Sequence, residues 1–124
     1  MAGHMDQPDI ESMVEAALDG LPAMFRDRLG SVAIVVEDEA SPAQLAELRV
    51  PGLFGLYQGV PRTAWNADAS PFASKITIFR GPLVRAYRDP ARLAAAVTDT
   101  VHHEIAHHFG ISDARLRELK TSAG

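Results

Sequence analysis

His103-Glu104-Ile105-Ala106-His107, an HExxH motif, is the stretch that decides the fold of this chain. On an α-helix each residue advances by roughly 100°, so histidines four positions apart lie about 40° apart on one face. Both imidazoles can therefore reach a single Zn²⁺ ion. Glu104 projects beside that face, where a carboxylate is suited to activate a water molecule as a general base. The motif thus predicts one helix that supplies two metal ligands and a base.

The pattern continues beyond the second histidine. Gly110 follows His107 by three residues and is suited to end the helix, because glycine adopts a positive φ at little steric cost. Asp113 follows His107 by six residues, the position of the third ligand in the HExxHxxGxxH/D pattern. Three protein ligands leave a fourth position for water, as catalysis requires. We therefore predict that His103, His107 and Asp113 bind one zinc ion per chain.

Simpler interpretations of these residues stay open beside the metal site. The two histidines and Glu104 can be ordinary polar residues on a helix flank, although the length of the complete motif argues against this. Either Ser112 or Asp113 can be the N-cap of a short last helix, since both precede the helix-forming segment 114–119.

Composition limits the class of protein. The 124 residues, 47% of them hydrophobic, suffice for one core, so we expect a single domain over residues 9–124. Met1-Ala-Gly-His-Met5 is typical of a vector-derived leader, so we expect residues 1–8 to be disordered and His4 not to be a ligand. The net charge of −4 and the lack of a dense basic run argue against nucleic acid and anionic membranes as partners.

The absence of cysteine excludes disulfides and leaves histidine and carboxylate side chains as the zinc ligands. No apolar run approaches the roughly 20 residues that span a bilayer, and the N-terminus lacks a basic region followed by an apolar one. We therefore expect a cytoplasmic protein.

The remaining segments predict helices around a small sheet. Apolar spacing indicates an amphipathic helix from Asp9 to about Gly20. The β-branched run 31–36 predicts a buried central strand. Ser41 and Pro42 begin a short helix that extends to about Leu48. Residues 50–74, rich in glycine and proline, form the longest irregular region, and loops of that size are often functional. Within this region Gly55-Leu-Tyr-Gln-Gly is interpreted as a short strand or turn near the site.

The motif helix has strong boundary signals. Asp89 and Pro90 are a typical N-cap and first helical residue, so this helix is predicted to extend to about Phe109. On such a helix His102 falls away from the metal side, and His108 falls between the metal and apolar sides. Neither is assigned as a ligand, and each is expected to form a hydrogen bond or face solvent.

Over roughly residues 10–120 the chain resembles a bacterial family of small zincin-like metallopeptidases. The matching landmarks are Glu15-Ala-Ala-Leu-Asp-Gly-Leu-Pro, Val32-Ala-Ile-Val-Val-Glu-Asp-Glu, Gly55-Leu-Tyr-Gln-Gly-Val-Pro, Ile76-Thr-Ile-Phe-Arg-Gly-Pro-Leu and the segment from His103 to Asp113. The resemblance implies an α/β (α+β) zincin-like fold, with a small mixed sheet packed against the HExxH helix. It also implies His103, His107 and Asp113 in the ligand positions and Glu104 in the catalytic position.

Further residues are candidate substrate contacts. In zincins the strand next to the active-site helix commonly holds an extended substrate by main-chain pairing, and the resemblance makes Ile76, Thr77 and Ile78 the candidates. The alternative is an ordinary edge or interior strand. Tyr57 is either a hydrogen-bond donor to a tetrahedral oxyanion or a packing aromatic with a hydrated hydroxyl. Trp65 either contacts substrate or covers the core.

Together these features predict a zinc-dependent peptidase that acts on a peptide or protein substrate, with Glu104 carrying the proton from the activated water to the leaving amine. The alternatives are a non-catalytic zinc-binding module that captures peptides or proteins, and hydrolysis of a non-peptide amide. Metzincins place a methionine-containing turn under the metal, whereas none of the eleven residues after Asp113 is Met. The floor of this site must therefore be built differently.

Overall fold

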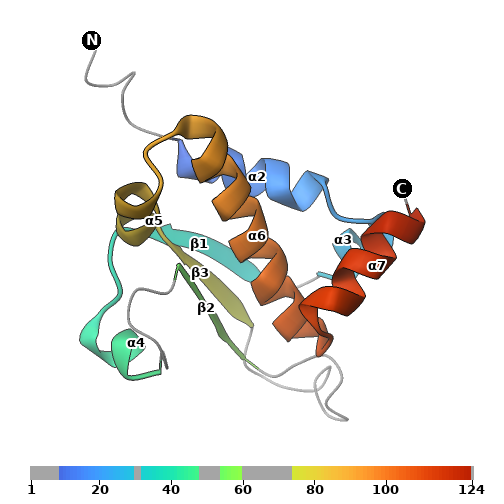
Figure 1. Ribbon diagram of the computed structural model, residues 1–124. Coiled ribbons are helices and arrows are strands. Elements are labelled where there is room, and N and C mark those ends of the chain that lie inside the picture. Colours follow the sequence, from blue (N-terminus) through green and yellow to red (C-terminus); the bar gives the residue numbers. More distant parts are fainter. Residues whose placement is uncertain (1–8, 30–31, 48–53, 60–73, 124) are drawn as a thin grey trace.

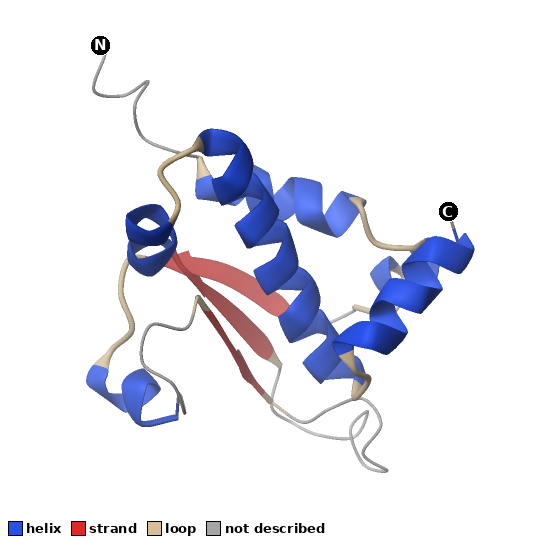
Figure 2. Ribbon diagram, in the orientation of Figure 1, coloured by secondary structure: helices blue, strands red, loops and turns tan. Residues whose placement is uncertain are grey.

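The computed structural model describes residues 9–29, 32–47, 54–59 and 74–123 (Figures 1 and 2). The helices are α2 (Ile10–Asp19), α3 (Ala23–Arg26), α4 (Pro42–Glu47), α5 (Arg80–Ala86), α6 (Pro90–Phe109) and α7 (Asp113–Ala123), and the strands are β1 (Ala33–Glu37), β2 (Gly55–Gln58) and β3 (Lys75–Phe79). This is an α+β fold, as predicted. Trp65 and most of the predicted irregular region lie outside the described residues. No helix among those described is long and apolar enough to cross a membrane.

The three strands form one mixed sheet with β3 in the centre, in the order β1-β3-β2. β1 runs parallel to β3 with Ile34 opposite Ile76, and β2 runs antiparallel to it with Tyr57 opposite Ile76. The prediction of a buried central strand at 31–36 is therefore wrong, because β1 is an edge strand of the described sheet and all its residues are partly or fully exposed. A β-branched run favours a strand, but it does not specify that strand's neighbours.

The core lies where α6 packs on the sheet and on α2. Ile105 and Val101 of α6 are fully buried there, and burial of each such side chain contributes about 1.5–3 kcal/mol. Other fully or nearly fully buried members of this cluster include Ile10, Val14 and Ala17 of α2, Ile76 and Ile78 of β3, and Leu93, Val97 and Ala106 of α6. Because this packing buries one side of α6, the functional site can form only on the side that the sheet and α2 leave uncovered.

α6 begins and ends where its sequence signals predict. The Asp89 side chain caps the N-terminus by accepting a hydrogen bond from the Arg92 N–H at 3.0 Å. At the other end Gly110 adopts a left-handed conformation with φ 68°, and its N–H donates to the carbonyl of His107. The chain then reverses direction into α7, which begins beside the C-terminal end of α6 and leaves it at an angle (Figure 1).

From the sequence, the segment 75–80 is interpreted as a half-buried strand that Gly81 and Pro82 break, so helix α5 was not predicted. Both residues lie in the first turn of α5, where a missing N–H is tolerated. The Gly81 N–H donates to the carbonyl of Asp38 at 2.8 Å, and a side chain at Gly81 would overlap Asp38 and Glu39. The Gly-Pro pair therefore marks a direct transition from strand to helix.

Candidate metal centre

A cleft of about 780 Å³ lies between α6, β2 and α7, a size typical of ligand sites. Its lining residues are Phe54, Gly55, Leu56 and Tyr57 at β2, Asp99, Thr100, His102, His103, Glu104 and His107 on α6, and Asp113, Leu116, Arg117 and Lys120 on α7. The two histidines and the glutamate of the HExxH motif thus face the cleft.

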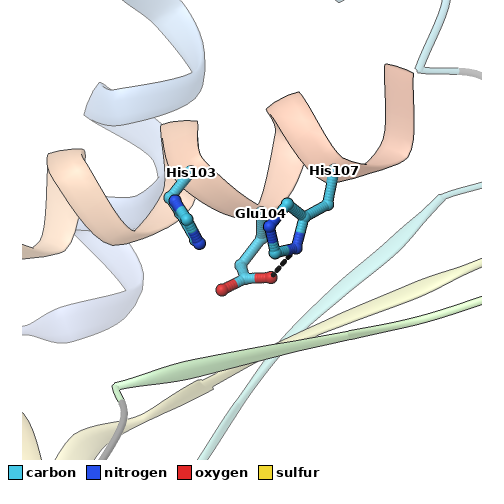
Figure 3. Close-up of side chains that lie close together, drawn as sticks. All are labelled: His103, Glu104 and His107. Carbon is cyan, nitrogen blue, oxygen red and sulfur yellow. Dashed lines mark ion pairs between the residues drawn. The ribbon is translucent and has the colours of Figure 1, made fainter. Parts of the chain in front are cut away.

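The three motif side chains lie together on one side of α6. His103, Glu104 and His107 project from the helix towards β2 (Figure 3). A potential ligand atom from each of the three lies within 4.8 Å of those of the other two. The two imidazole rings are 4.3 Å apart, centre to centre. Helical spacing has therefore produced the arrangement that it predicts, a histidine pair with a carboxylate beside it.

Glu104 differs from the two histidines in its burial. Its side chain is 7% exposed, against 51% for His107, and its Oε1 lies 3.3 Å from His107 Nδ1. Burial raises the pKa of Glu104 above its usual value, although the neighbouring His107 and His103 act in the opposite direction. A carboxyl group with a raised pKa is better matched to proton transfer near neutral pH.

Gly55 of β2 explains how Glu104 becomes buried. A Cβ atom at Gly55 would lie 2.8 Å from Thr100 Cγ2 and 3.4 Å from Glu104 Cγ. The first distance is too short for two carbon atoms, so a side chain here would push β2 away from α6. Glycine thus lets the strand cover the carboxyl. Sequence reasoning missed this role, for which the only signal was the glycine in a segment shared with the resembling family.

The Asp113 carboxylate contacts the site at the imidazole of His103. Its Oδ2 and Oδ1 atoms lie 2.8 and 3.0 Å from His103 Nδ1, and both side chains are about half exposed. The Ser112 hydroxyl accepts the hydrogen bond from the Arg115 N–H, so Ser112 is the cap of α7 and the Asp113 carboxylate remains free to face His103. A carboxylate on one imidazole nitrogen leaves the other nitrogen for a metal. The ligand role of Asp113 itself stays a prediction.

Tyr57 lines the cleft from β2, but its hydroxyl has protein partners. It lies 3.1 Å from His108 Nδ1 and 3.1 Å from Ser74 Oγ. These contacts support the interpretation of Tyr57 as a packed aromatic with a hydrogen-bonded hydroxyl. Its contact with a reacting oxyanion stays a prediction.

A sequence-family model described as zincin-like metallopeptidase matches residues 29–123, which include every element that lines the cleft. The chain belongs to the zincin-like metallopeptidase family. No curated protein sequence matches it. The family match confirms both the resemblance and the zincin-like fold, and it agrees with a His, Glu and His group able to hold a metal.

The candidate substrate strand of this zincin-like domain requires a correction. Ile76, Thr77 and Ile78 are fully buried, and β3 is paired along both edges, with β1 on one side and β2 on the other. These residues therefore have no free edge on which to hold a peptide, and the interior-strand alternative is the one observed. Among the described strands, β2 is the one that lies along the cleft and pairs on one side only.

The other two histidines of the zincin-like helix form hydrogen bonds, as predicted. His102 Nε2 lies 2.8 Å from the carbonyl oxygen of Ala17, and its Nδ1 lies 2.8 Å from Lys120 Nζ. Burial is the main cause of its lowered pKa. His108 contacts the Tyr57 hydroxyl. These bonds tie α6 to α2, α7 and β2 around the site, and the role of Lys120 had no signal in the sequence.

Proposed function

We propose that this chain is a zinc-dependent peptidase that cleaves peptide bonds in the cleft between α6 and β2. The observation that carries the proposal is the buried Glu104 carboxyl beside the paired imidazoles of His103 and His107. A site that only stabilises a fold needs no base and is normally closed by four protein ligands. Membership of a metallopeptidase family supports the same conclusion.

The side chains present fit a zinc ion. Zinc accepts imidazole and carboxylate ligands. The imidazoles of His103 and His107 lie together beside the Glu104 carboxyl, and the Asp113 carboxylate contacts His103. His103, His107 and Asp113 would hold the ion, with the Asp113 carboxylate already adjacent to His103. When bound, zinc supplies the Lewis acidity that polarises a carbonyl group and acidifies a water molecule.

Glu104 moves the proton in this proposal. Its carboxylate takes a proton from the attacking water and delivers it to the nitrogen of the leaving amine. The cover provided by Gly55 keeps bulk water from the carboxyl and maintains its raised pKa. In this proposal an extended peptide pairs with the β2 main chain, which would orient the scissile bond over α6, and the position of β2 at the cleft and at one edge of the described sheet supports it.

The test is cleavage of a diverse peptide library by zinc-loaded protein, read by mass spectrometry. Glu104→Gln is the control, because it keeps both histidines and removes only the base. We expect cuts with the unmodified protein alone. Equal cutting by both proteins would contradict the assignment of Glu104. Stoichiometric zinc with no cuts in either would favour the non-catalytic peptide-binding module.

A further inference from the structure

The α7 wall of the cleft carries two cations, Arg117 and Lys120. They lie three residues apart on one helix, and residues at that spacing are neighbours on its surface. Within the described ranges no carboxylate lies within ion-pair distance of either side chain, whereas Arg115 on the same helix pairs with Glu118 at 3.1 Å. The two cations that face the cleft are therefore not neutralised by the pairing used elsewhere on α7.

Lys120 is held in place by His102. The carbonyl of Ala17 can only accept a hydrogen bond, so His102 Nε2, at 2.8 Å, carries the proton and donates it. His102 Nδ1 must then accept from the Lys120 ammonium, also at 2.8 Å. Because His102 is buried at 6% exposure, this acceptor is fixed in position. One of the three ammonium N–H groups is thereby used, and the others remain for a ligand.

We propose that Lys120, assisted by Arg117, binds a carboxylate of the peptide substrate at the α7 side of the cleft. The inference rests on the proposed peptidase function and specifies its substrate class. Three carboxylates also line the cleft, Asp99, Glu104 and Asp113. Asp113 faces His103 and Glu104 faces His107, so Asp99 is the carboxylate of this lining that is left opposite the two cations. A fixed ammonium next to a guanidinium is a suitable receptor for a single carboxylate. That carboxylate is either a free peptide C-terminus or an Asp or Glu side chain.

The first test measures peptide binding without turnover. The full-length Glu104→Gln protein, loaded with zinc, is titrated against three fluorescein-labelled pentapeptides of alanine and leucine, with fluorescence anisotropy as the readout. One peptide has a free C-terminal carboxylate, one has a C-terminal amide, and one has the amide together with a Glu side chain at its last position. We expect one or both carboxylate peptides to bind more tightly than the neutral amide, and the tighter of the two identifies the source of the carboxylate.

Lys120→Gln should weaken binding of the preferred carboxylate peptide by about 10-fold or more, the scale of a hydrogen bond to a charged group, and leave the neutral amide unchanged. Arg117 is exposed, and its side chain has no hydrogen-bond or ion-pair partner among the described residues. Arg117→Gln should therefore cause the same selective loss at about 2- to 5-fold. Arg115→Gln removes the same charge from α7 outside the cleft, and it should change neither affinity.

Equal binding of all three peptides, binding of none, or an equal loss for charged and neutral peptides in Lys120→Gln would overturn the inference. Because Arg117→Gln disturbs no internal contact, it tests the carboxylate site even if Lys120→Gln unfolds. The same peptides incubated with the Glu104-intact protein separate the two proposals. Carboxylate-selective binding without cleavage would contradict the proposed peptidase function and support the carboxylate site. Equal cleavage of peptides with and without the carboxylate would support the peptidase function and contradict the carboxylate site.

Discussion

The cleft side and the packed sides of α6 use the same residue type for different purposes. His103 and His107 on the cleft side have side chains that are 45% and 51% exposed. His102, at the edge of the cleft, and His108, on a packed side, are 6% and 2% exposed, and each is hydrogen-bonded to another element of the fold. The comparison shows that surroundings decide what a histidine does. A buried imidazole is engaged by the protein, whereas an exposed one keeps a nitrogen for a metal.

The largest expected effect is on zinc affinity, which should depend on the exposed histidines and not on the buried ones. His107→Ala should weaken zinc binding by more than about 100-fold, because even the loss of an outer partner of a ligand costs about 10- to 100-fold. The measurement is competition with a chromophoric chelator. His102→Gln serves as the matched control and should retain its zinc. Equal affinity in the wild type and His107→Ala would show that the cleft side does not bind the metal.

The second prediction concerns stability, for which the buried histidines should matter more than the exposed ones. In metal-free protein, His108→Ala should lower the free energy of unfolding by about 2 kcal/mol, because it removes a buried ring and leaves the Tyr57 hydroxyl with one partner fewer. His107→Ala should lower it by no more than about 0.5 kcal/mol, as expected of an exposed side chain. Urea unfolding with a chelator present gives both values. A larger loss for His107→Ala would reverse the assignment.

Glu104 is the buried member of the cleft side, so its burial should oppose folding. Its pKa is raised by burial from the ordinary 4.5, so its contribution to stability is present below pH 4.5 and is lost as the pH rises through the raised value. Glu104→Gln should therefore stabilise metal-free protein at pH 8 by about 0.5–2 kcal/mol. Thermal unfolding at pH 8 and at pH 4 measures the gain, which should shrink in acid. A variant less stable than the wild type at pH 8 would contradict this.

The smallest effect concerns His102. Because burial lowers its pKa below the ordinary 6.5, its contribution to stability is present above pH 6.5 and is lost as the pH falls through the lowered value. His102→Gln cannot take up this proton, so its stability should fall less than that of the wild type on acidification, by about 1 kcal/mol or less. Urea titrations between pH 8 and pH 5 give the free energy of unfolding of each protein as a function of pH. The same pH dependence in the wild type and in His102→Gln would mean that His102 is not held neutral.

The sequence by itself determined the parts of the molecule that depend on near neighbours in the chain. The start of α6 at Asp89 and Pro90 and its end at Gly110 are capping effects within a few residues. The meeting of His103, Glu104 and His107 follows from the turn of a single helix. These local rules also excluded His102 and His108 from the metal side before the fold was known.

Only the tertiary structure decided which distant segments meet. The central place of β3, the cover that Gly55 gives to Glu104, and the hydrogen bond from His102 to Ala17, 85 residues away, all join parts of the chain that no short pattern links. Periodicity predicts that a face will be buried, but it does not specify what covers it. For that reason the metal side of α6 was predictable from the sequence, whereas the pairing of β2 with β3 and the fixed position of Lys120 were not.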